Sequence, residues 1–144
     1  MNVKQYLSQI ERYDKNINNK LSELYQLKSM VGSIKTVMGG CGKINGKKDP
    51  LGNAVAKIVD TENNIYKEIE KYIALRKKIV TQINGLDNML HYQILYAKYV
   101  EYKTFERIAE EINYSWRQTI RLHGMALIEF EKMYNDEIMS WNVI

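Results

Sequence analysis

The residues with the most recognisable chemistry lie between Trp116 and Arg121. Arginine can donate two hydrogen bonds to guanine, glutamine can pair with adenine, and apolar atoms can meet a thymine methyl group. These residue types gather on or near one side of the first two turns of a predicted helix. The candidate base-contacting set is Trp116, Arg117, Gln118, Ile120 and Arg121.

The helix that would carry these side chains has a clear predicted start and a clear inward face. Ser115 is followed three residues later by Gln118, which is the pattern of a capping box, and the helix is expected to run from Trp116 to about Met133 or beyond. The apolar spacing indicates the face turned toward the protein core, made of Thr119, Leu122, Ala126, Leu127 and Phe130.

A second, shorter helix precedes it, ending at the turn Asn113-Tyr114-Ser115. Thr104 is a predicted N-cap, and Asn113 is a residue type that tolerates the left-handed conformation of a turn. Ala109 is small enough for another helix to cross closely, so the pattern predicts a helix-turn-helix. The inward face is expected to hold Phe105, Ile108, Ala109 and Ile112, and the predicted phosphate contacts are Lys103, Arg107 and His123.

Two longer segments earlier in the chain carry apolar stripes with three-and-four spacing, interrupted by a region rich in glycine. We expect a flexible loop at about 32–53 and an all-α fold, in which residues 1–84 form an antiparallel, coiled-coil-like helical hairpin. The break at Asn84-Gly85 predicts a domain boundary, with the helix-turn-helix domain over 85–144. The stripes comprise Leu7, Ile10, Ile17, Leu21, Leu24 and Val31, then Val55, Ile58, Ile65, Ile69, Tyr72, Ile79, Ile83 and Leu86.

Composition excludes several classes of site. The chain of 144 residues has 21 Lys and Arg against 17 Asp and Glu, a net charge of +4 that leans mildly toward polyanions. Cys41 is the only cysteine, so no intrachain disulfide or cysteine-based zinc site is expected. Neither a P-loop at Gly39 to Lys43 nor a metal site at His91 and His123 has the required pattern. We predict no cofactor, no metal, no enzymatic activity, no membrane segment and a cytoplasmic location.

The C-terminal third resembles region 4 of sigma-70-type factors. The resemblance lies in "IAEEINYS", in "TIRLHGMALIEF" after it, and in the Ala126-Leu127 pair eleven and twelve residues after Ser115. That family's base-reading positions fall on Trp116, Arg117, Ile120 and Arg121, where the apolar Trp116 and Ile120 depart from the usual charged residues. Recognition of a standard promoter element is therefore not implied.

Most of the chain, including "DPLGNAVAKIVDTENNIYKEIEKYIALRKKI", is similar to phage and prophage proteins grouped with the ArpU and RinA late-gene transcription regulators. The resemblance implies a sequence-specific regulator of phage late or packaging genes. It would bind double-stranded DNA in the cytoplasm of a bacterial host cell, with host RNA polymerase as a further partner.

Alternatives to this interpretation remain open at the level of sequence. The two helices could pack in an ordinary bundle with Arg117 and Arg121 as a solvated face, and Trp116 could anchor a protein partner. The stripes could pack within one chain or between chains, although paired DNA half-sites favour a homodimer. The competing functions are a coiled-coil structural or interaction protein, and a phage inhibitor that binds a host protein.

Overall fold

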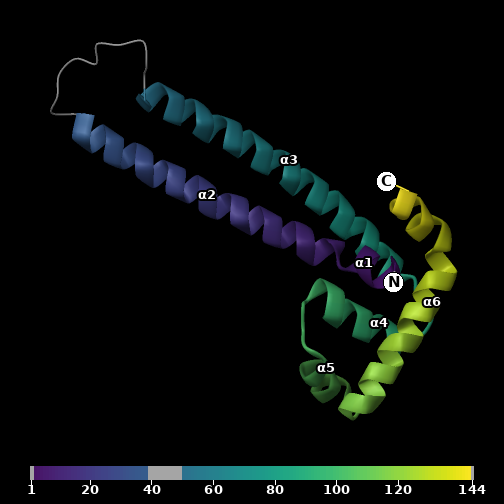
Figure 1. The fold of residues 1–144 in the computed structure, drawn as a ribbon. Coiled ribbons are helices and arrows are strands. Elements are labelled where there is room, and N and C mark those ends of the chain that lie inside the picture. Colours follow the sequence, from purple (N-terminus) through teal and green to yellow (C-terminus); the bar gives the residue numbers. More distant parts are fainter. Residues whose placement is uncertain (1, 39–49, 144) are drawn as a thin grey trace. The chain divides into compact units, whose positions relative to one another are not determined.

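The computed structural model describes residues 2–38 and 50–143, and every element in these ranges is helical (Figure 1). The predicted all-α class is therefore confirmed for the part of the chain that is described. Cys41 and the Gly39 to Lys43 segment lie outside it. The elements are α1 (Asn2–Leu7), α2 (Gln9–Met38), α3 (Pro50–Asn84), α4 (Met89–Leu95), the π-helical η1 (Tyr96–Val100), α5 (Phe105–Ile112) and α6 (Trp116–Val143).

The helices flanking the glycine-rich region extend further than the predicted loop boundaries at about 32 and 53. α2 continues to Met38 and α3 begins at Pro50, so Gly32 and Gly52 are helical. Proline is well suited to a first helical position, because its missing N–H has no helical partner there. A single glycine costs about 1 kcal/mol relative to alanine, which a long helix can absorb. The rest of the predicted loop, residues 39–49, is outside the described part.

The chain divides into two compact units, and the division differs from the predicted boundary at residues 84 and 85. One unit combines Met1–Tyr13 with Tyr72–Ile144, and the other is Asp14–Lys71. The first unit therefore includes α1, the start of α2 and the last turns of α3. A local break such as Asn84-Gly85 marks the end of a helix but does not reveal which distant segments pack together.

The first unit has a continuous hydrophobic core. Val3 and Leu7 of α1 are buried in the same cluster as Phe130 of α6. Burying a side chain of this size stabilises the fold by about 1.5–3 kcal/mol. The other buried members of the cluster are Tyr6, Ile10, Ile79, Ile83, Leu86, Leu95, Tyr99, Val100, Ala126, Leu127 and Ile138.

The end of α6 contributes to this core. The helix continues past an irregular residue, Tyr134, with φ −125° and ψ 29°, and buries Ile138 one turn later. Trp141 packs edge-on against the Tyr6 ring, with 5.9 Å between ring centroids, whereas Met139 is exposed. Gly85 lies against the Tyr134 hydroxyl, where an added Cβ would clash.

The second unit contains parts of α2 and α3 and has little core among its described residues. Ion pairs join Lys20 to Glu68 at 3.9 Å and Lys28 to Glu62 at 3.2 Å, so the two helices run antiparallel within this unit. Among its described residues the buried apolar side chains are Ile17 and Ile65, whereas Leu21, Tyr25, Met30, Val55, Val59 and Tyr66 are exposed.

The segment between α3 and α5 contains two short helical elements, α4 and η1. Asn88 caps α4, because its Oδ1 accepts hydrogen bonds from the amides of Leu90 at 2.9 Å and His91 at 3.3 Å. Helix α4 therefore begins at Met89, and the π-helical η1 follows it directly and ends at Val100. Among the described helices, none has both the length and the apolar composition needed to cross a membrane.

Candidate nucleic-acid interface

Helix α5 is fixed at its N-terminus by a cap and along one side by a small core. Thr104 Oγ1 accepts a hydrogen bond from the Arg107 amide at 3.2 Å, as its sequence position predicted. Ile108 is fully buried with Ile94 and Ala97, and partly buried side chains complete this second core: Phe105, Ile112 and Leu122. Helix α5 thus packs against both η1 and α6.

The turn between α5 and α6 has the backbone conformation that the sequence indicated. Asn113 adopts the left-handed region at φ 60° and ψ 39° and ends α5. This position lets the Tyr114 amide donate to the Ala109 carbonyl at 3.1 Å, which satisfies an otherwise open carbonyl. Ala109 itself is buried, in agreement with its predicted place on the inward face.

The capping box at the start of α6 is formed in both directions. The Gln118 amide donates to Ser115 Oγ at 3.1 Å, and the Ser115 amide donates to Gln118 Oε1 at 3.3 Å. The Ser115 hydroxyl lies 3.3 Å from the same Oε1. Because bidentate pairing with adenine needs this oxygen as an acceptor, the cap and the predicted base contact of Gln118 compete.

Helix α6 presents two distinct sides. Thr119 is fully buried and its hydroxyl donates to the Ser115 carbonyl at 2.8 Å, while Leu122 is partly buried. The predicted inward residues Ala126, Leu127 and Phe130 are buried as well. The opposite side exposes Trp116, 53% accessible, together with Arg117 and Arg121, and Ile120 is partly exposed.

The two arginines of α6 differ from the cations near α5 in their electrostatic surroundings. Within the described part of the chain, Arg117 and Arg121 form no ion pair. Two adjacent arginine side chains on the outer side of a helix, without carboxylate partners, present a positive surface to solvent. Such a surface attracts anions, and the planar guanidinium group suits phosphate and guanine edges.

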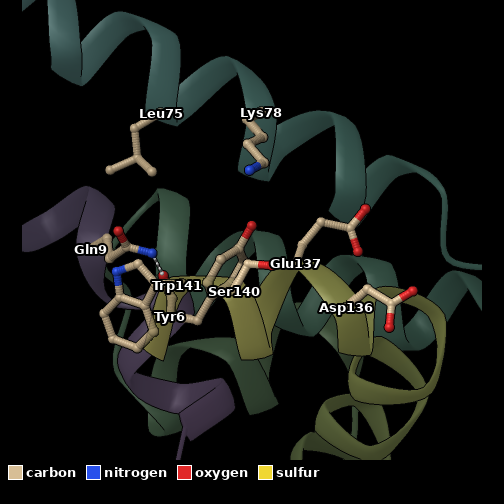
Figure 2. A pocket seen from close by; sticks show the side chains of 8 residues that line it. All are labelled: Tyr6, Gln9, Leu75, Lys78, Asp136, Glu137, Ser140 and Trp141. Carbon is tan, nitrogen blue, oxygen red and sulfur yellow. Dashed lines mark hydrogen bonds between the residues drawn. The ribbon is translucent and has the colours of Figure 1, made fainter. Parts of the chain in front are cut away.

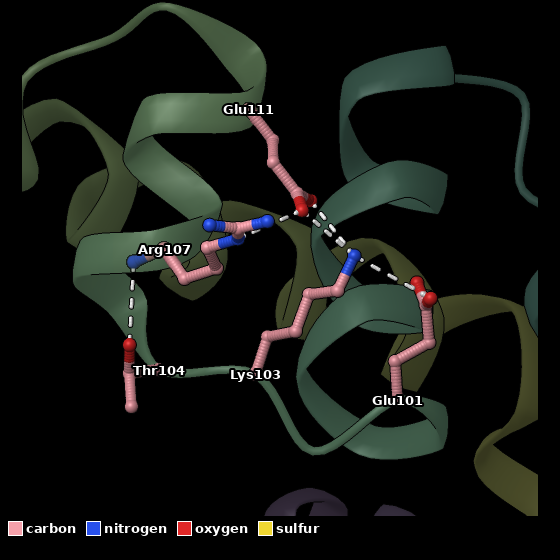
Figure 3. Close-up of polar contacts among 5 residues, drawn as sticks. All are labelled: Glu101, Lys103, Thr104, Arg107 and Glu111. Atoms are coloured by element: carbon pink, nitrogen blue, oxygen red, sulfur yellow. Dashed lines mark hydrogen bonds and ion pairs between the residues drawn. The ribbon is translucent and has the colours of Figure 1, made fainter.

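Lys103 and Arg107, by contrast, are already paired (Figure 3). Lys103 Nζ lies 2.8 Å from Glu111 Oε1 and 3.4 Å from Glu101 Oε2, and Arg107 Nε lies 3.3 Å from Glu111 Oε1. The hydrogen bond from Lys103 lowers the pKa of Glu111, and the same bond raises the pKa of Lys103. A phosphate at these two predicted contacts would have to compete with the Glu111 carboxylate.

His123 does not lie where its predicted phosphate contact requires. The residue is 6% accessible, and its Nε2 shares a 2.8 Å hydrogen bond with the Tyr99 hydroxyl. The Phe105 ring packs edge-on against the imidazole at 4.9 Å between centroids. Burial, and then the charges of Lys4 and Lys98, lower the pKa of His123 to about 4. The structure therefore corrects this assignment: His123 is a neutral core residue at physiological pH.

Two residues that shape this surface were missed by the sequence prediction. Glu111 lies four residues after Arg107, so its pairing with that arginine was visible as a helical i,i+4 spacing. The contact of Tyr99 with His123 spans 24 positions in the chain, and no local pattern indicates it.

Other parts of the first unit offer less chemistry. A surface cavity of about 460 Å³ is lined by Lys78, Asp136 and Glu137 together with the Tyr6 and Trp141 rings (Figure 2). The side-chain Nε2 of Gln9, in the wall of this cavity, donates a hydrogen bond to the backbone carbonyl of Tyr6 at 2.8 Å. No described residues form a group of three His, Cys, Asp or Glu side chains able to hold a metal ion.

The exposed side of α6 that carries Trp116, Arg117 and Arg121 is thus the strongest candidate site in the described part of the chain. Comparison of the chain with protein-family models, with curated proteins and with solved structures gave no match.

Proposed function

We propose that α5, the turn at Asn113 to Ser115 and α6 form a helix-turn-helix that binds double-stranded DNA, with α6 in the major groove. The observation that carries the proposal is the pair Arg117 and Arg121. Both are exposed on the first two turns of a helix whose opposite side is anchored in the core, and neither has a carboxylate partner among the described residues.

The spacing of the two arginines suits base readout. Four residues advance a helix by about 6 Å, which is close to two base-pair steps of B-form DNA. Each guanidinium can donate two parallel hydrogen bonds to O6 and N7 of a guanine. The cap and the buried face of α6 keep the helix in one position, so the arginines approach the groove without first ordering the backbone.

Neighbouring side chains would add contacts of other kinds. Trp116 and Ile120 offer apolar surface to a thymine methyl group or to the sugar-phosphate backbone. Gln118 keeps its amide N–H donors available while its oxygen serves the cap, so it would donate a single bond to a phosphate or base. Lys103 and Arg107 would contribute where a phosphate displaces Glu111.

The resemblance to ArpU and RinA proteins extends the proposal to a regulator of phage late or packaging genes. In this role the protein would act as a homodimer on paired half-sites in the host cytoplasm, together with host RNA polymerase. The exposed apolar side chains of the second unit, including Leu21, Val59 and Tyr66, support association because they leave that unit with little core of its own.

Selection of bound sequences from random duplex DNA tests the proposal directly. The selected duplex should then be titrated with Arg117→Ala and Arg121→Ala, each of which should weaken binding about 10- to 100-fold and relax preference at one position. Arg76→Ala is the matched control, since it removes the same exposed charge from α3. No enriched sequence, or equal effects of all three substitutions, would contradict the assignment.

A second candidate function is binding of a protein partner through the same helix. Trp116, Met125 and Ile128 are 53%, 46% and 54% accessible, and these apolar side chains extend well beyond the first two turns of α6. Such a surface suits a host protein target. Capture of a host protein from nuclease-treated lysate that is lost with Trp116→Ala and retained with Arg117→Ala would favour this candidate.

A further inference from the structure

The N-terminal helix places a cation beside the proposed DNA-binding surface. Val3 and Leu7 of α1 are buried in the core against α6, whereas Lys4 is exposed between them. Lys4 lines a surface cavity of about 500 Å³ together with Ile120, Arg121 and His123. Packing of α1 therefore adds a positive charge from the first residues of the chain to the neighbourhood of Arg121.

A second cation approaches the same region from η1. Lys98 Nζ lies 4.3 Å from the centroid of the Phe105 ring, and that ring packs on His123. The contact with the ring face holds the ammonium group without using its hydrogen-bond donors. Both Lys4 and Lys98 are close enough to His123 for their charges to lower its pKa, which places them around one side chain of α6.

The local charge balance favours an anion. We define the basic cluster as Lys4, Lys98 and Arg121. Glu131 lines the cavity that contains Lys4 and Arg121, but no ion pair involving Lys4, Lys98 or Arg121 occurs within residues 2–38 and 50–143. Lys4 and Arg121 are therefore exposed and Lys98 is half-buried, and none of the three is held in an ion pair among these residues, unlike the paired cations around Glu111.

We propose that Lys4 and Lys98 bind backbone phosphates of the duplex that flanks the groove entered by α6. This inference rests on the proposed function, and it makes α1 a part of the DNA-binding unit. Phosphate contacts account for much of protein–DNA hydrogen bonding and set the position of the protein on the duplex without reading its sequence. Lysine suits this task because its charge sits on a long, flexible stem.

The experiment compares Lys4→Gln, Lys98→Gln and the double variant in the full chain. The probes are the duplex selected from random DNA and a mixed-sequence duplex of the same length. Loss of one phosphate contact should make the negative slope of log affinity against log salt shallower by about 0.9 and weaken binding about eightfold at about 0.1 M salt. Both duplexes should lose affinity by the same factor, so that the ratio of specific to non-specific binding stays constant.

Matched variants separate a charge contact from a structural effect. Lys78→Gln removes an exposed lysine that lines the other cavity (Figure 2) and should leave both affinity and salt slope unchanged. Lys4→Arg and Lys98→Arg keep the charge and should retain the wild-type slope. Thermal unfolding followed by circular dichroism checks that every variant has the wild-type helix content.

The possible failures are distinguishable. If the wild-type chain binds neither duplex, the proposed function is wrong, and so is the assignment of Lys4 and Lys98 as phosphate contacts. If the wild type binds but the double variant keeps the wild-type slope, only the assignment of Lys4 and Lys98 is overturned. A loss confined to the selected duplex would also overturn it, because that result indicates base readout rather than phosphate binding.

Discussion

The burial of His123 predicts a specific dependence of stability on pH. In the folded protein its pKa is about 4, against an ordinary value of 6.5. As pH falls below 6.5, this imidazole binds a proton in the unfolded chain, whereas in the folded chain it stays neutral until the pH approaches 4. The free energy of unfolding therefore decreases through the window from pH 6.5 to pH 4, and it is unaffected by this group above that window.

The size of the effect follows from proton linkage. With these two pKa values, His123 should lower the free energy of unfolding by about 2 kcal/mol between about pH 8 and about pH 5. The physical cost is that of placing a charge in a nearly dry site, where Tyr99 and Phe105 surround the ring and Lys4 and Lys98 repel a proton.

Urea unfolding of the wild type and of His123→Gln, followed by circular dichroism across this pH range, measures the effect. The variant lacks the titrating group, so its curve of unfolding free energy against pH should be flatter by about 2 kcal/mol over the same interval. The other ionisable groups are the same in both proteins and cancel in the difference. Parallel curves for the two proteins would refute the claim that His123 is buried as a neutral side chain.

The other predictions concern the ends of α5 and α6. Ser115→Ala removes the acceptor for the Gln118 amide and should cost about 1 kcal/mol in urea unfolding, whereas Ser115→Asp should retain most of the stability. Asn113→Ala places a Cβ-bearing residue without a polar side chain in the left-handed region and should cost about 1 kcal/mol, while Asn113→Gly should cost less. Glu111→Gln removes the carboxylate that pairs with Lys103 and Arg107. If these cations contact phosphates, the affinity for the duplex, measured by fluorescence anisotropy, should rise severalfold. An unchanged affinity would show that Lys103 and Arg107 do not contact the DNA.

Local features of the C-terminal segment were predictable because their signals span only a few residues. A serine and a glutamine three positions apart form a capping box through hydrogen bonds within one helical turn. Asn113 ends α5 because its short polar side chain tolerates the left-handed conformation. The buried face of α6 followed from helical periodicity for the same reason.

The prediction for His123 was wrong although the spacing pointed to the correct answer. The residue follows the buried Thr119 by four positions and precedes the buried Ala126 by three, so helical periodicity places it on the inward face. Because histidine is polar, its side chain was expected to face solvent instead. A buried histidine needs a hydrogen-bond partner, and the partner, Tyr99, comes from η1.

By itself, the amino-acid sequence determined the helical class, the caps of α5 and α6 and the side of α6 that faces the core. These depend on backbone hydrogen bonds and on spacings within a few turns of one helix. Only the tertiary structure decided that Lys103 and Arg107 share Glu111, that His123 is buried, and that α1 brings Lys4 beside Arg121. The contacts of Lys103, His123 and Lys4 join different segments of the chain, and their formation depends on how the helices pack rather than on any pattern within one helix.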